Sequence, residues 1–516
     1  MDSNDIQALV DRAGANEVIL QVENGELRFR CKPGAMSPQL LHDLKASRAQ
    51  LLEHLGRRAD SQRIEGTLPQ FSVRVLPEAG RIPCFRKASW NGIKAGIVQV
   101  DSTNGPHWVV KVRGVVNLDA LERACVVMTE RHDALRASAF DTEDGPCLLV
   151  EPRVSFSLQR IDLTDTPSER REAEARDIAS NLVWKTFDLS VAPLFRAFAI
   201  LLGPREYVFG CVFHHFVVDR MSSDILKREV LEAYLAYSNL EPPSVLREPC
   251  VHYSEYLLSI ENWLTTAGAA PHVSFWRERL AGVPAVTLPT STRSTGASAG
   301  ARLDIEIESQ LAAGIFEAAR VMRVTPFLLL LASQYVLLSR LTGLEDITVG
   351  TVIHGRETAP LQRVVGNLAD RVYYRVNLSG NPRFAEVVLR VRANVLEAEP
   401  HQFVRSDILT RIRGSEGPLH APIFNYLPAN PIESLPPLWN KPDESVVGFG
   451  LAAPPALSIA NPQMCYWLAL NGTPTGIRGE FRFGGPVLPE LSSAFISVLS
   501  QAVRWNRLRL RSFTLP

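Results

Sequence analysis

The sequence predicts a mixed α/β (α+β) protein in which a small unit precedes two larger blocks. Three observations lead to this prediction. The 516 residues exceed a typical domain of about 150. An Asn-Gly pair between two short alternating strands marks a hairpin near the N-terminus. Helical and strand patterns then alternate on both sides of a Thr/Ser- and Ala/Gly-rich stretch. We expect a small unit at 1–57, a linker at 58–81, and blocks at 82–284 and 285–516.

The small unit is predicted to have an αββα order. Apolar residues at helical spacing open it, and alternating strands at 18–23 and 26–31 follow, joined by Asn24-Gly25. Both of these turn residues tolerate a positive φ, which a two-residue hairpin loop requires. Ser37 before Pro38 then marks a helix start, since serine caps helices and proline suits the first helical position.

Composition excludes several function classes. Lys plus Arg and Asp plus Glu both number 55, so no net field recruits nucleic acid or anionic lipid. The seven cysteines show no Cys-x-x-Cys spacing, which indicates reduced thiols in a cytosolic protein. No secretory signal and no apolar run of about 20 residues are present, so we expect a soluble, cytoplasmic protein.

The segment from Tyr207 to Asp219 carries the chemistry. An apolar strand runs into His214 and His215, and Asp219 follows four residues later. Successive strand side chains point to opposite faces, so one imidazole faces a cavity while the other is held in the scaffold. A histidine can accept a proton near neutral pH. A buried core histidine and a metal ligand are the alternatives, and the opposed faces with no further His/Cys cluster argue against zinc.

The His-His-x-x-x-Asp pattern after an apolar strand resembles the core motif of nonribosomal peptide synthetase condensation domains. The resemblance implies two chloramphenicol-acetyltransferase-like halves in a V-shaped pseudo-dimer, with the active site between them. It assigns catalysis to His215 and structural roles to His214 and Asp219. Residues 1–57 resemble the β-hairpin docking domains of assembly-line synthetases, which capture a short, often acidic tail of an upstream subunit. The basic residues Arg28, Arg30 and Lys32 are the candidate contacts.

Further segments extend the resemblance. The stretch 131–140 matches a family segment that places Arg136 near the active centre. The stretch 365–375 matches another, with Asp370 and Arg371 replacing the usual Asn and Thr, and it offers Arg375 as the partner of Asp219. His401-Gln402 and Pro422 to Tyr426 match later segments, whereas the opening motif is poorly represented around 88–93.

Two polar residues beside the motif are candidate channel residues. Arg220 stands where the family normally has Gly, so it either narrows a substrate channel, pairs with an anionic acceptor, or turns away to a neighbouring acid. The Ser222 hydroxyl is one candidate oxyanion stabiliser, and a backbone N–H is another.

The resemblance implies transfer of a carrier-bound acyl thioester to an amine or hydroxyl, forming an amide or ester. No carrier attachment motif occurs, so we expect a free-standing enzyme that releases a chain onto a small-molecule acceptor. No cofactor or metal is expected, because an upstream acyl or peptidyl carrier protein supplies the phosphopantetheine arm. His215 acts as a base or only positions the nucleophile. An acyl-coenzyme A acyltransferase and a non-catalytic recruitment domain remain alternatives.

Overall fold

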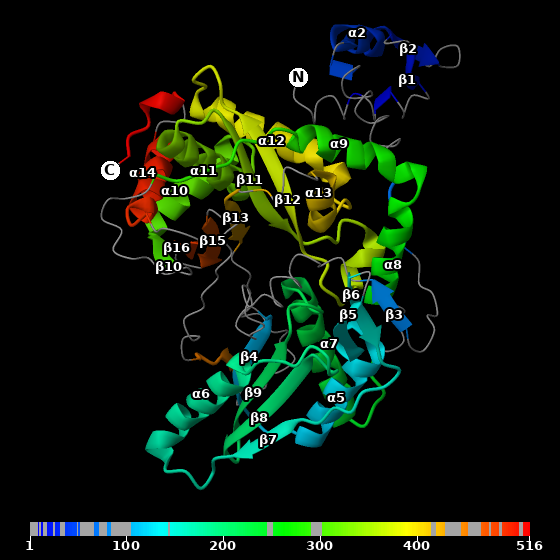
Figure 1. The fold of residues 1–516 in the computed structure, drawn as a ribbon, viewed down its shortest axis with the longest axis vertical. Helices are drawn as coiled ribbons and strands as arrows, with labels where there is room; N and C mark the ends of the chain where they lie inside the picture. Colours follow the sequence, from blue (N-terminus) through cyan, green and yellow to red (C-terminus); the bar gives the residue numbers. More distant parts are fainter. Residues whose placement is uncertain are drawn as a thin grey trace. The chain divides into compact units, whose positions relative to one another are not determined.

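The chain divides into two compact units, residues 1–69 with 266–270, and residues 70–265 with 271–516. The computed structural model (Figure 1) describes residues 9, 12–13, 18–23, 26–30, 37–48, 50–51, 67–71, 80–83, 105–142, 145–244, 251–289, 302–413, 419, 421–428, 445–451, 466–473, 476–483, 488–504 and 509–515.

The small unit contains the predicted hairpin and the predicted capped helix. Strands β1 (Ile19–Glu23) and β2 (Glu26–Arg30) pair antiparallel, with Glu23 opposite Glu26. Helix α2 (Pro38–Ala46) begins as predicted, because the Ser37 Oγ accepts the Leu40 N–H at 3.1 Å. Apolar residues of the hairpin and helix form one buried cluster. Arg28 and Arg30 lie in β2, and Lys32 lies outside the described residues.

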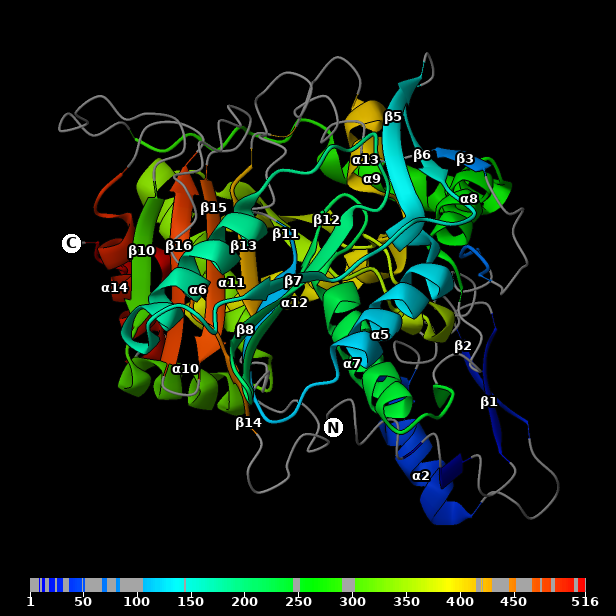
Figure 2. The same cartoon turned by 90° about the horizontal axis from the view of Figure 1, so that it is seen from below.

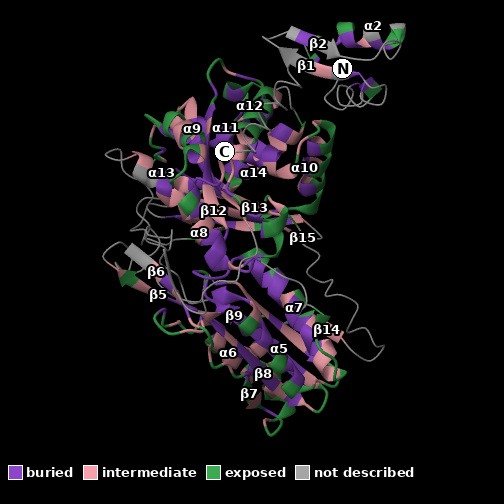
Figure 3. Ribbon diagram, turned by 90° about the vertical axis from the view of Figure 1, so that its right-hand side faces the viewer, coloured by how far each residue is buried: buried purple, intermediate pink, exposed green. Residues whose placement is uncertain are grey.

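The first half of the large unit is built on a five-stranded sheet in the order β14-β4-β9-β8-β7. Four of its strands come from the first half of the sequence: β4 (His107–Arg113), β7 (Gln159–Asp162), β8 (Phe195–Gly203) and β9 (Glu206–Phe213). Helix α6 (Ser168–Trp184) packs on one face through Ala175, Ala179 and Val183. Helices α5 (Leu118–Arg131) and α7 (Arg220–Ser238) cover the other face (Figure 2). Buried residues follow β8, β9 and α7 in Figure 3.

A small sheet and one helix complete this half, and the next helix contacts the second half, where Trp276 Nε1 donates to the His401 carbonyl at 2.8 Å. The sheet has the order β3-β6-β5, with β3 (Gly80–Pro83), β5 (Ala137–Thr142) and β6 (Gly145–Val150). Helices α8 (Tyr253–Leu264) and α9 (Ala270–Leu280) follow in the chain. The N-terminus of α8 is held by Asp133, whose carboxylate accepts the N–H groups of Tyr253 and Ser254, both at 2.9 Å.

The second half is built on a six-stranded sheet in the order β10-β16-β15-β13-β11-β12. Its strands are β10 (Arg302–Ile307), β11 (Asp346–Ile353), β12 (Asp370–Asn377), β13 (Ile423–Leu427), β15 (Tyr466–Thr473) and β16 (Gly476–Phe483). Its helices are α10 (Ser309–Val321), α11 (Pro326–Thr342), α12 (Phe384–Ala398), α13 (Ser406–Arg413) and α14 (Leu491–Arg504). The alternation of helices and strands in both halves confirms the predicted mixed α/β class.

One strand of the predicted second block pairs in the sheet of the first half. β14 (Ser445–Gly448) lies far along the chain from the first half, yet it pairs antiparallel with β4, with Val446 opposite Val112. Residues 445–448 therefore belong to the sheet of the first half. The four-residue strand carries little local signal, because its pairing is decided by a partner more than 300 residues away in the sequence.

Helix α11 is the most apolar helix of the described part of the chain. Residues 328–339 are all buried within the second half. Among the residues that the structure describes, no single helix is long and apolar enough to cross a membrane; α10 and α11 meet that length and composition only as a pair, bent by 105°.

Candidate active site

His214 is buried and bonded within the turn that follows β9. It follows the last residue of β9, and its Nδ1 accepts the Phe216 N–H at 3.0 Å. The edge of its ring meets Phe187, with ring centroids 5.9 Å apart. Burial, followed by the nearby His215 and Arg196, lowers the pKa of His214 to about 3. The ring is therefore neutral at physiological pH and fixes the turn between β9 and α7.

His215 faces the opposite way and is exposed. Its Nδ1 lies 3.0 Å from the Val218 carbonyl oxygen, which can only accept a hydrogen bond. The proton is therefore on Nδ1, and the lone pair is on Nε2. This tautomer makes Nε2 the proton acceptor of the ring, so the loop that follows β9 both orients the imidazole and sets its chemistry.

Asp219 holds the loop rather than taking a proton. It is the N-cap of α7, and its carboxylate accepts the Ser222 N–H at 2.8 Å. The same carboxylate accepts the N–H groups of Leu368 and Ala369 at 2.9 and 3.1 Å. Although burial alone would raise the pKa of Asp219, the charge and hydrogen bonds of Arg356 keep it below its ordinary value.

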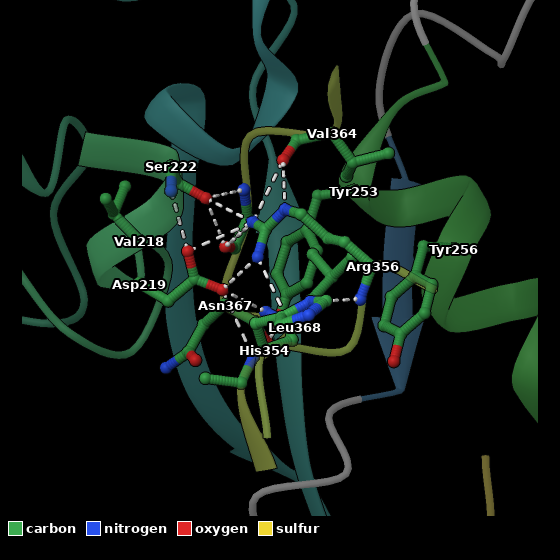
Figure 4. A network of polar contacts seen from close by, with 12 residues as sticks. Val218, Asp219, Ser222, Tyr253, Tyr256, His354, Arg356, Val364, Asn367 and Leu368 are labelled. Atoms are coloured by element: carbon green, nitrogen blue, oxygen red, sulfur yellow. Dashed lines mark hydrogen bonds and ion pairs between the residues drawn. The ribbon is translucent and has the colours of Figure 1, made fainter. Parts of the chain in front are cut away.

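Arg356 is the partner of Asp219, and the prediction of Arg375 was wrong. The Arg356 guanidinium donates to both carboxylate oxygens, at 2.8 and 3.0 Å, and its side chain is completely buried (Figure 4). Arg375 instead pairs with Asp346 at 2.7 Å. Sequence reasoning missed Arg356 because it lies in the loop after β11, 137 residues from Asp219. Gly355, two residues after the end of β11, has a positive φ and precedes Arg356 in this loop.

Ser222 is not a channel residue, so that prediction was also wrong. Its side chain is fully buried. The Oγ donates to the Gly366 carbonyl at 2.6 Å and accepts from the Gly366 N–H at 2.9 Å and from Arg356 at 2.6 Å. With both lone pairs and the proton engaged, the hydroxyl cannot stabilise an oxyanion.

The loop at 364–370 ties these groups to His215. Arg356 donates to the Val364 and Gly366 carbonyls, and the Asn367 side-chain amide donates to the His215 backbone carbonyl. Gly366 is required here, since a Cβ would lie 2.2 Å from the Tyr253 ring. The loop thus contacts the His215 turn directly, which sequence reasoning did not predict for Asn367.

The same loop is held on its other side by a second buried ion pair. Arg405 lies 3.6 Å from the Asp370 carboxylate and donates to the Tyr256 hydroxyl at 2.8 Å. The Asp370 carboxylate also accepts the N–H and hydroxyl of Ser406, at 2.8 and 2.6 Å. Asp370, which stands where the family pattern has Asn, is therefore bonded to Arg405 and Ser406.

Arg136 joins two elements of the first half. Its guanidinium donates to the carbonyls of Thr129, Glu130 and Glu151 at 2.7, 2.7 and 2.9 Å. These bonds join the end of α5 to the end of β6, and none of them reaches the His215 turn. The neighbouring Arg131 is paired with an acid, Glu229, at 3.3 Å.

Arg220 is exposed at the first position of α7, directly after Asp219. Among the described residues no acid forms an ion pair with it. Burial raises the pKa of Asp224 despite the charges of Arg220 and Lys227 on the same helix. Within the described part of the chain, no group of three His, Cys, Asp or Glu side chains could hold a metal ion. The site can therefore orient an imidazole, and the exposed Arg220 follows it at the start of α7.

Comparison with protein families identifies two regions. The model of the condensation domain matches residues 104–429, and the model of the TubC N-terminal docking domain matches residues 6–56. A linear gramicidin synthase subunit of Brevibacillus parabrevis is 31% identical over 322 residues, 62% of this chain. Phosphinothricin tripeptide synthetase PhsB of Streptomyces viridochromogenes is 27% identical over 411 residues, 77% of this chain. The matches span 6% and 34% of these relatives.

Solved structures share the fold. The X-domain from teicoplanin biosynthesis superposes with a TM-score of 0.71 and 20% identity, covering 87% of this chain and 100% of that domain. The condensation domain of the Monacolin K polyketide synthase MokA superposes with a TM-score of 0.67 and 18% identity, covering 84% and 99%. These likenesses confirm the predicted fold.

Proposed function

The chain belongs to the condensation domain family, and on that premise we propose that it transfers a carrier-bound acyl group to an amine or hydroxyl acceptor. The observation that carries the proposal is the orientation of His215. Its ring is exposed, and the Val218 carbonyl fixes the proton on Nδ1. Nε2 is thereby prepared to receive a proton from an attacking nucleophile, or to hold that nucleophile by a hydrogen bond.

The reaction balances without a cofactor bound by this chain. The acceptor nitrogen or oxygen bonds to the acyl carbon, and the carbon–sulfur bond of the thioester breaks. The proton of the acceptor passes to His215 Nε2 and then to the departing thiolate. Because a thiolate leaves readily, orientation of the two reactants supplies much of the rate. The phosphopantetheine arm that carries the acyl group belongs to the partner carrier protein.

The partners follow from the two matched regions. The docking domain match places residues 6–56 in a class named for docking, which supports capture of the C-terminal tail of an upstream subunit. We assign Arg28, Arg30 and Lys32 to that contact. The acceptor is a soluble small molecule, so the transfer releases the chain. A hydroxyl acceptor gains support from SgcC5 of Streptomyces globisporus, a structure with TM-score 0.61 and 20% identity that was solved in complex with a naphthyl ethanediol.

The decisive experiment follows acyl transfer from a loaded carrier protein by intact-protein mass spectrometry. We expect His215→Ala and His215→Asn to lower turnover by about 10²- to 10⁴-fold, with unchanged thermal unfolding because the side chain is exposed. The Asn variant retains a donor for the Val218 carbonyl but has no base. The exposed His42 gives the matched control, His42→Ala. Undiminished turnover in both His215 variants would instead favour a recruitment role.

A second arm tests the rival donor. The starter condensation domain of rhizomide synthetase RzmA, with TM-score 0.64 and 17% identity, was solved in complex with C8-CoA, so acyl-coenzyme A must be compared. We expect the carrier thioester to react faster than the coenzyme A thioester of the same acyl group. Equal rates would favour an acyl-coenzyme A acyltransferase.

A further inference from the structure

Tyr253, the first residue of α8, contacts the loop at 364–370 with both its ring and its hydroxyl. Its side chain is buried. The hydroxyl donates to the Asn367 carbonyl at 3.2 Å, and Figure 4 draws both residues in the network of the loop. The ring lies against Gly366, where a Cβ would come within 2.2 Å of it. A helix of the first half therefore supports the loop that contacts the His215 turn.

The hydroxyl holds one end of a peptide group whose other end is held by Asp219. The Asn367 carbonyl and the Leu368 N–H belong to the same planar peptide. The carbonyl accepts the Tyr253 hydroxyl, and the N–H donates to the Asp219 carboxylate at 2.9 Å. Because a peptide turns as a rigid unit, a rotation of this group moves both of its ends away from their partners.

This peptide helps to direct the side chain of Asn367. The preceding peptide is also held, since the Gly366 carbonyl accepts the Ser222 hydroxyl at 2.6 Å. The Asn367 Cα therefore lies between two peptide groups that are both hydrogen-bonded. Its side-chain amide donates to the His215 backbone carbonyl. The hydroxyl of Tyr253 thus reaches the His215 turn through one intervening residue.

Tyr253 is itself held in place on two sides. Its N–H donates to the buried carboxylate of Asp133 at 2.9 Å. Its ring stacks on that of Tyr256 in the next turn of α8, with ring centroids 6.3 Å apart. A side chain that packing and hydrogen bonds fix in one position can hold a neighbouring group in a defined geometry.

We propose that Tyr253 is a positioning residue for the acyl transfer that we assign to His215, an inference that rests on the proposed function. The hydroxyl holds the peptide after Asn367, and Asn367 holds the backbone of the His215 turn. Orientation of reacting groups supplies much of the rate of such a transfer. Loss of this one buried hydrogen bond should therefore lower kcat about fivefold.

The kinetic test compares Tyr253→Phe, which keeps the ring, with a matched loss of a buried hydroxyl. Tyr335 on α11 is completely buried, and its hydroxyl donates to the Tyr374 carbonyl at 2.6 Å. We expect Tyr253→Phe and Tyr335→Phe both to lower the midpoint of urea unfolding, because each loses a buried hydrogen bond. Only Tyr253→Phe should lower kcat, with KM unchanged.

A double variant tests whether the hydroxyl acts through Asn367. If it does, Tyr253→Phe/Asn367→Leu has the same kcat as Asn367→Leu alone, because the side chain that the hydroxyl positions is already gone. A further fivefold loss in the double variant would mean that Tyr253 acts by another route, and it would overturn the proposal.

Amide hydrogen exchange gives a readout that does not require turnover. We expect exchange in residues 214–218 and 366–369 to be about fivefold faster in Tyr253→Phe than in the unmodified chain, and unchanged in Tyr335→Phe. Equal exchange in the two variants would contradict the support of this loop by Tyr253.

The two measurements separate the failure of this inference from the failure of the proposed function. An unmodified chain that transfers no acyl group removes the function, while faster exchange in Tyr253→Phe still shows that the hydroxyl holds the turn. An active chain in which Tyr253→Phe and Tyr335→Phe have equal kcat overturns the role of Tyr253 alone.

Discussion

The two guanidinium N–H groups of Arg356 clasp the carboxylate of Asp219 at 2.8 and 3.0 Å, and both side chains are buried. This pair joins the loop after β11 in the second half to the N-terminus of α7 in the first. A buried ion pair stabilises only while both partners are present, because removing one leaves an uncompensated charge.

We predict that Arg356→Met destabilises the large unit by about 3–5 kcal/mol, measured by urea unfolding. The double variant Asp219→Asn/Arg356→Met should lose less than the sum of the two single variants, because no charge is left unpaired. Arg320→Met is the control, since Arg320 pairs with Glu317 at the surface and should show little change. Additive effects in the double variant would contradict the coupling.

Asn367 should act as a positioning residue for His215. Its side-chain amide donates to the His215 backbone carbonyl. We predict that Asn367→Leu lowers kcat about tenfold with little change in KM, because the turn loses its anchor while substrate contacts remain. Asn367→Asp should also move the acid limb of the pH–rate profile to higher pH, because a nearby carboxylate favours the protonated imidazole. A rise in KM with constant kcat would assign Asn367 to substrate binding instead.

His214 should make stability depend on pH. Burial lowers its folded-state pKa from 6.5 to about 3, so the unfolded chain binds the extra proton between these values. Stability then falls as the pH drops from 6.5 toward 3. We predict that His214→Asn, whose Oδ1 can accept the Phe216 N–H, flattens this part of the curve of unfolding midpoint against pH. His42→Asn is the control and should leave the slope unchanged.

Arg220 should determine whether acceptors that carry a carboxylate bind better than uncharged ones. It is exposed directly after Asp219, and no described acid pairs with it. If it meets an anionic acceptor, Arg220→Ala raises KM about tenfold for acceptors that carry a carboxylate and leaves KM for uncharged acceptors unchanged. Steady-state kinetics with matched acceptor pairs measure this preference. If the ratio of KM for charged to uncharged acceptors is the same in Arg220→Ala and in the unmodified chain, Arg220 has no electrostatic role in acceptor binding.

Docking should depend on the basic residues of β2. Arg28 and Arg30 stand two residues apart in β2. We predict that Arg28→Glu/Arg30→Glu weakens binding of an acidic peptide from the upstream C-terminus about tenfold, measured by fluorescence anisotropy. Lys45→Glu, exposed on α2, is the control. Affinity that is independent of salt in the unmodified chain would argue against a charged contact.

Local sequence patterns were sufficient to predict several elements of the molecule. The Asn-Gly pair predicted the pairing of β1 with β2, and Ser37 with Pro38 predicted the start of α2, because turn and cap chemistry acts over a few residues. His214 is buried and His215 exposed, but both follow the last residue of β9, so the turn rather than strand alternation separates them.

Tertiary structure decided which distant groups meet. Arg356 rather than Arg375 reaches Asp219, Ser222 is sealed inside the network, and Asn367 touches the His215 turn. β14 joins a sheet whose other strands lie in the first half. Sequence by itself predicted many of the elements and singled out the imidazole to which we assign the chemistry, because these predictions rest on period and local bonding. The contacts that hold the turn around that imidazole, from Arg356 to Asp219 and from Asn367 to the His215 backbone, join loops more than 130 residues apart, and no local pattern encodes them.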